Sequence, residues 1–180
     1  MKKIFLLIFL TLFLAFSSGC SQKHIDYSID VAMINADYNL LVERYDVLRA
    51  FVISKWEIFS EADKMKLSTI NDNVERIINK VDVLRSLRAY ELSPADIGYM
   101  YTLGKQSYIM SKEIYMNYEP QMSQYEILLI KMFDDRAKDL DKQMNDLMYD
   151  PQNADINHTL VSILNVVSVG LKLILPLLVT

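Results

Sequence analysis

Six apolar residues between positions 67 and 84 recur at intervals of three and four residues, and this spacing constrains the fold more than any other feature. The series is Leu67, Ile70, Val74, Ile77, Val81 and Leu84. Such intervals place side chains on one face of an α-helix, whereas a half-buried strand needs alternation at every second residue. The sequence therefore predicts a long amphipathic helix with one apolar face that another element must cover.

Three further segments carry the same signature. An apolar series runs from Ile34 to Phe59, and the charged residues between its members, among them Asp37 and Arg44, are expected on the solvent face. The segments beginning at Ser93 and Ser123 are typical helix starts, because a capping serine is followed three positions later by an acidic residue. Short connections favour antiparallel neighbours, so we expect an all-α, up-down four-helix bundle over residues 28–150. A partly continuous rod or an oligomeric coiled coil is the alternative.

Residues 156–180 form a separate, hydrophobic C-terminal segment. From Thr159 to Thr180, 14 of 22 residues are Leu, Val or Ile, which is enough for a membrane helix. Polar residues nevertheless recur on one side, at Ser162, Asn165, Ser168 and Lys172. Three interpretations stay open. The helix is a fifth bundle element, or it spans a membrane between Leu160 and Leu178 with Lys172 paired or snorkelling, or it lies on a membrane or oligomerises.

The first twenty residues, MKKIFLLIFLTLFLAFSSGC, have the layout of a secretory signal. Two lysines precede an apolar run, and small residues lead directly to Cys20, the only cysteine of the chain. This arrangement resembles the lipobox of bacterial lipoproteins, although Ser17 stands where an aliphatic residue is usual. The alternative is an ordinary secreted protein in which Cys20 is a residual thiol.

The resemblance to lipoproteins implies a signal peptide over residues 1–19 and acyl chains, such as palmitate, on Cys20. Residues 20–27 would then be a lipidated tether. By the same resemblance, Ser21 favours the outer membrane, with the protein facing the periplasm.

Composition and motifs exclude several functions. The formal net charge of −4 argues against a nucleic-acid partner. The sequence has no P-loop, GxSxG or HExxH motif, and its two histidines, His24 and His158, lie in the tether and at the start of the last segment. We therefore expect no catalytic residue, no metal, no cofactor and no small-molecule substrate. The acidic run from Asp134 to Asp141 is interpreted as a solvated helix face, with a weak cation site as the alternative.

Three tyrosines spaced by seven residues, Tyr101, Tyr108 and Tyr115, share one helix face. They are either part of the bundle interior, with hydroxyls reaching solvent, or a partner-binding surface, because tyrosine is enriched at interfaces.

These features predict a non-enzymatic envelope lipoprotein that acts as a tether, a scaffold or a partner-binding module. Its partners would be the membrane, through Cys20, and another envelope protein or a second copy. An N-terminal lipobox combined with a C-terminal membrane helix is also similar to the layout of the single-chain spanins of phages. That resemblance implies a protein that links or fuses the inner and outer membranes during lysis.

Overall fold

The computed structural model describes residues 30–86, 92–119 and 121–179, and within these ranges every regular element is a helix. The five long helices are α2 (Val31–Val52), α3 (Glu61–Ser86), α4 (Pro94–Tyr118), α5 (Gln124–Tyr149) and α6 (Ile156–Val179). A short 3-10 helix, η1 (Trp56–Ile58), follows α2. The predicted all-α class is confirmed, while the predicted signal peptide, Cys20 and the tether lie outside the described residues.

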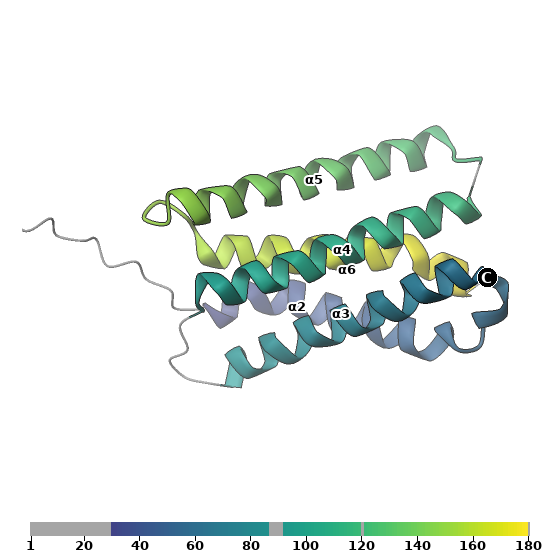
Figure 1. Cartoon of the computed structure of the whole chain (residues 1–180), viewed down its shortest axis with the longest axis horizontal. Coiled ribbons are helices and arrows are strands. Elements are labelled where there is room, and N and C mark those ends of the chain that lie inside the picture. Colours follow the sequence, from purple (N-terminus) through teal and green to yellow (C-terminus); the bar gives the residue numbers. More distant parts are fainter. Residues whose placement is uncertain (1–29, 87–91, 120, 180) are drawn as a thin grey trace, which may run out of the picture.

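The four-helix bundle is not confirmed, because five long helices run along one another (Figure 1). The C-terminal helix α6 packs against α2, α4 and α5, and α3 packs against α2 and α4. Most of α6 is buried, including Leu160 and Leu178. A helix that is apolar nearly all round gains most free energy when neighbours cover it on several sides. In the structure α6 is therefore a fifth bundle element.

The predicted helix starts at Ser93 and Ser123 are confirmed. Each serine accepts a hydrogen bond from the backbone of the third helical residue, and the acidic side chain of that residue, Asp96 or Glu126, bonds back to the serine. Asp30 caps α2 in a similar way, through bonds from two backbone N–H groups. These caps fix where three of the five helices begin.

The first helix ends earlier than its apolar series. Helix α2 stops at Val52, where Ser54 Oγ donates a hydrogen bond to the Phe51 carbonyl oxygen over 2.8 Å. Side-chain bonds of this kind compete with the helical backbone pattern. The chain turns through η1, yet Phe59, the last member of the series, is still buried in the core.

Two glycines let α4 and α6 approach closely. A Cβ atom placed on Gly170 would lie 3.1 Å from Tyr108 Cα, and one on Gly104 would lie 2.9 Å from Val167 Cγ2. A side chain at Gly170 would therefore meet the backbone of α4, and one at Gly104 would require the side chain of Val167 to shift. Gly98 has no heavy atom within 4 Å of such a Cβ position.

We expect Gly170→Ala to lower the free energy of unfolding by about 1–3 kcal/mol, because the added methyl group meets backbone that must shift. The matched Gly98→Ala variant should raise it by up to about 1 kcal/mol, since alanine favours the helix and meets nothing there. Urea unfolding followed by circular dichroism measures both. Equal stability of the two variants would show that the α4–α6 contact is not tight.

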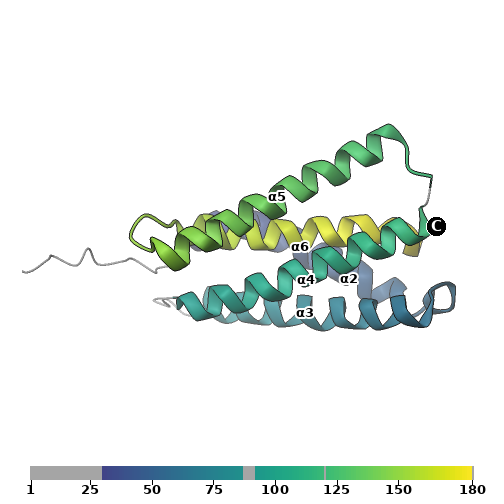
Figure 2. The ribbon, with the colours of Figure 1, turned by 45° about the horizontal axis from the view of Figure 1, so that its top comes forward.

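Helix α5 differs from the other four in how closely it packs. It lies near α6 at its C-terminal end and diverges from the bundle toward its N-terminal end (Figure 2). Side chains on this diverging half are open to solvent: Tyr125 is 72% exposed, Leu128 56% and Met132 48%.

Candidate functional site

The three tyrosines singled out in the sequence lie on the face of α4 that meets α5. Their hydroxyl groups donate hydrogen bonds to carboxylates of α5: Tyr101 to Asp141 over 2.7 Å, Tyr108 to Asp134 over 2.8 Å, and Tyr115 to Glu126 over 2.8 Å. Tyr108 and Tyr115 are buried, and Tyr101 is half-buried. The seven-residue spacing thus places the three tyrosines on the same face of α4. Their hydroxyl groups form hydrogen bonds within the chain. Binding of a partner by these residues stays a prediction.

Lysines of α4 reinforce the same contacts. Lys105 Nζ lies 2.6 Å from Asp141 Oδ1, and Lys112 Nζ lies 2.6 Å from Asp134 Oδ2. Asp134 and Asp141 therefore face α4 and are half-buried, so the prediction of a solvated face is wrong for these two residues. We call these contacts the α4–α5 polar ladder; its members are Tyr101, Lys105, Tyr108, Lys112, Tyr115, Glu126, Asp134 and Asp141.

The ladder changes the acidity of its members. Burial and the hydrogen bond to Asp134 raise the pKa of Tyr108 above its ordinary value, and burial with the bond to Glu126 raises the pKa of Tyr115 to about 12. Burial alone would raise the pKa of Asp134, but the bonds from Lys112 and Tyr108 outweigh it and the pKa lies below its ordinary value. At neutral pH these tyrosines are hydrogen-bond donors to carboxylates, not nucleophiles.

Replacing Asp134 by Ala should destabilise the protein by about 1–3 kcal/mol, because the buried hydroxyl of Tyr108 loses its acceptor and Lys112 its counter-charge. The adjacent Asp135 is a matched control, since it is exposed and its one ion pair within the described part of the chain is with Lys138 on the same helix. Asp135→Ala should change stability by less than about 0.5 kcal/mol. Chemical unfolding measures both variants, and equal effects would show that the ladder does not hold α5.

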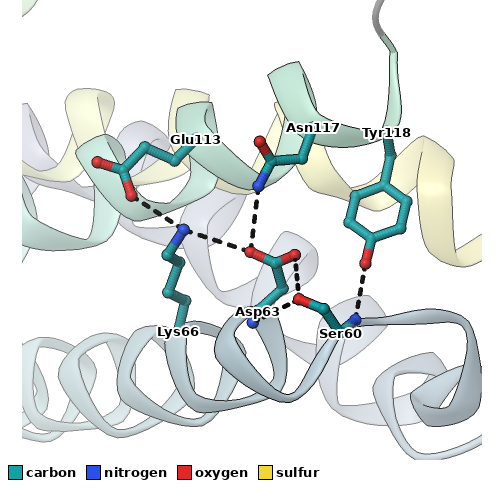
Figure 3. Close-up of polar contacts among 6 residues, drawn as sticks. All are labelled: Ser60, Asp63, Lys66, Glu113, Asn117 and Tyr118. Atoms are coloured by element: carbon teal, nitrogen blue, oxygen red, sulfur yellow. Dashed lines mark hydrogen bonds and ion pairs between the residues drawn. The ribbon is translucent and has the colours of Figure 1, made fainter.

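A second polar cluster joins the start of α3 to the end of α4 (Figure 3). The carboxylate of Asp63, 4% exposed, lies at its centre. It accepts hydrogen bonds from Ser60 Oγ over 2.7 Å, from Lys66 Nζ over 3.3 Å and from Asn117 Nδ2 over 3.3 Å. Lys66 also pairs with Glu113, and the Ser60 N–H donates to the Tyr118 hydroxyl. Since its polar groups bond to one another, this cluster fixes two helix ends.

Burial alone would raise the pKa of Asp63, but the bonds from Ser60 and Lys66 hold it below its ordinary value. A lowered carboxyl pKa in the folded state adds stability above the unfolded-state value of about 3.9, and this contribution is lost as pH falls through the folded-state pKa.

Asp63→Asn should therefore lower the free energy of unfolding at neutral pH. Its difference from the wild type should shrink below about pH 4. Urea unfolding at several pH values tests this. As the control, exposed Asp72 of the same helix can be replaced by Asn, which should matter little at any pH. A difference for Asp63→Asn that stays constant with pH would contradict the assigned role of its charge.

The polar residues of α6 are bound by charged residues of its neighbours. Asp37 of α2 and Arg136 of α5 both bond to the Asn165 amide, over 3.2 Å and 2.8 Å. Arg44 donates to the Ser168 carbonyl and hydroxyl oxygens, both over 2.7 Å. Asp37 and Arg44 are thus half-buried against α6 instead of lying on the solvent face. Asp37 and Arg44 are seven residues apart, so they lie on one face of α2 next to its buried apolar series. This spacing could have indicated a helix-to-helix contact, and the sequence analysis did not use it.

A pocket of about 250 Å³ opens between α5 and α6. Arg136, Asp139 and Gln143 line it from α5, and His158, Ser162 and Asn165 are among its α6 residues. Lys172, on the same side of α6, is exposed. Within the described ranges no three His, Cys, Asp or Glu side chains are placed to hold a metal ion. The pocket therefore offers guanidinium, carboxylate, imidazole, hydroxyl and amide groups for non-covalent binding.

Comparisons with known proteins give no relative on which to base a function. No protein-family model, no curated protein and no solved structure matches the chain significantly.

Proposed function

We propose that this chain is a lipid-anchored protein of a bacterial or phage-encoded cell envelope that works without catalysis, as a tether, scaffold or partner-binding module. The observation that carries the proposal is the apolar N-terminal segment followed by the single cysteine, Cys20. Two or three acyl chains on that residue hold a protein on a membrane, because each buried CH₂ contributes about 0.8 kcal/mol. The proposed location is the outer membrane, facing the periplasm.

The helical body supports a binding role. Only ten positions separate Cys20 from Asp30, where the described structure begins, so the body stays close to the anchor. Its charged clusters are occupied by helix-to-helix contacts, as in the α4–α5 polar ladder and around Asp63. Exposed apolar side chains on α5 suit contact with another envelope protein or a second copy.

A second candidate is a spanin-like protein that links inner and outer membranes. The observation that favours it is α6, since Ile156–Leu178 is long and apolar enough to cross a membrane. A buried core helix passes the same test, and in the structure 67% of its apolar window is buried. This candidate therefore requires α6 to leave the bundle.

Mass spectrometry of the protein extracted from membranes should find the chain starting at Cys20 with acyl chains attached. The Cys20→Ser variant should appear in the soluble periplasmic fraction, because its anchor is missing and α6 stays within the bundle. Asp30→Ser, which keeps a capping side chain at α2, is the control and should stay in the membrane fraction.

The outcomes separate the two candidates. A bare Cys20 thiol or an uncleaved leader contradicts the lipoprotein proposal. Retention of Cys20→Ser in the inner membrane favours the spanin-like candidate instead.

A further inference from the structure

Two adjoining pockets lie between α5 and the first turns of α6. The first is the pocket of about 250 Å³ described above, and the second, of about 80 Å³, extends toward the turn that joins the two helices. Gln143 and His158 line both pockets, so the two form one elongated cavity, the α5–α6 cavity. One face of α5 forms its wall, because the lining residues of that helix are three or four positions apart: Arg136, Asp139, Gln143 and Asp146.

The charged side chains that line the α5–α6 cavity differ in sign from one end to the other. Arg136 lies at one end of the α5 face, and Asp139 follows one turn later. Asp146 and Asp155 line the other end. Within the described part of the chain, none of these four side chains is in an ion pair. The cavity is therefore complementary to a ligand that carries one anionic group and more than one cationic group.

Hydrogen-bonding groups of the cavity have unused capacity. Arg136 donates from Nη1 to Asn165 Oδ1 over 2.8 Å, and its guanidinium has further N–H donors. Asp155 accepts the His158 backbone N–H through Oδ1 over 2.9 Å, which leaves its second carboxylate oxygen. The Asn165 amide, by contrast, is already bonded to Arg136 and to Asp37 of α2. The remaining N–H groups of Arg136 suit a carboxylate, and the remaining carboxylate oxygens suit N–H donors.

Gln143 gives independent evidence for a ligand. Its side-chain oxygen, Oε1, is buried and has no hydrogen-bond partner within the described part of the chain. A buried polar atom without a partner is rare, and this residue lines both parts of the cavity. Lys138 and Lys142, its neighbours on α5, are exposed and line neither pocket. An ammonium or guanidinium group of a ligand would supply the missing donor.

We propose that the α5–α6 cavity binds a basic amino acid with a free carboxylate, either as the free molecule or as the C-terminal residue of a peptide. The carboxylate of this ligand pairs with Arg136, and its side-chain cation pairs with Asp146 and Asp155. The aliphatic chain between these two groups packs against Val161 and Val166, which form the apolar part of the lining. The ligand is bound without chemical change.

The length of the cavity favours an extended ligand. Arg136 and Asp146 are ten residues apart, about 15 Å along α5. Side chains cover part of this distance, but a compact zwitterion such as glycine would not reach both ends. In the free amino acid, the α-ammonium group pairs with Asp139 and donates to Gln143 Oε1. The inference goes beyond the proposed envelope function and does not depend on the lipid at Cys20.

Isothermal titration calorimetry of the full chain in detergent tests the proposal with L-arginine and two matched analogues. Citrulline has nearly the same shape but a neutral side-chain end, and agmatine lacks the carboxylate. We expect dissociation constants at least about fivefold higher for both analogues, because each leaves one end of the cavity without its counter-charge. Nα-acetyl-arginine identifies the source of the ligand. Affinity equal to that of arginine indicates the C-terminal residue of a peptide, and weaker binding indicates the free amino acid.

Two variants test the two ends of the cavity. Asp146→Asn should weaken arginine binding at least about fivefold and leave citrulline binding unchanged. Arg136→Gln should weaken arginine binding to a similar extent and leave agmatine binding unchanged. The matched controls are Asp135→Asn and Lys131→Gln, which make the same charge changes at exposed positions of α5 outside the cavity. Both controls should bind arginine like the wild type, and circular dichroism checks that all four variants are folded.

The inference is overturned if arginine does not bind, or if either analogue binds as tightly as arginine. It is also overturned if the two cavity variants bind arginine like the wild type, or if the controls lose binding to the same extent. Mass spectrometry of Cys20 decides the anchor separately, so failure of this inference is distinguishable from failure of the proposed function.

Discussion

The arrangement of this protein follows from the need to cover α6. Most of its side chains are aliphatic, so in water the helix is stable only where neighbours bury it on several sides. Gly104 and Gly170 bring α4 into close contact with it, and α2 and α5 cover two further sides. The position of α3 then follows, since its apolar face packs against α2 and α4.

Helical spacing in the sequence predicts which face of each helix is buried, but not which helix it meets. The series from Leu67 to Leu84 is buried throughout, and the helix starts at Ser93 and Ser123 lie where capping chemistry places them. The partners of the polar residues were not predictable in this way. Asn165 and Ser168 are contacted by residues more than a hundred positions earlier, and only the assembled fold brings α2 beside α6.

Two kinds of interface hold the helices together. The contacts of α2, α3, α4 and α6 are mainly aliphatic, while α5 joins α4 mainly through tyrosine hydroxyls, lysines and carboxylates. Ion pairs and hydrogen bonds between partly exposed groups add little net stability compared with apolar burial. Helix α5 contributes Phe133 and Leu140 to the common core, while Tyr125 and Leu128 on its diverging half stay exposed (Figure 2).

The two proposed functions make opposite demands on α6. The Asp30 N–H donates to Asn157 Oδ1 over 2.9 Å, which fixes the start of α2 beside the start of α6. The ten Cα-to-Cα steps from Cys20 to Asp30 reach at most about 36 Å, so a lipid on Cys20 would hold this end of the bundle close to the membrane. A folded binding module needs α6 in place, because α6 packs against α2, α4 and α5. A membrane-spanning α6 would break the contacts of Asn165 and Ser168 and expose the apolar faces of α2 and α4. Binding through the folded bundle and spanning by α6 therefore exclude each other in one molecule.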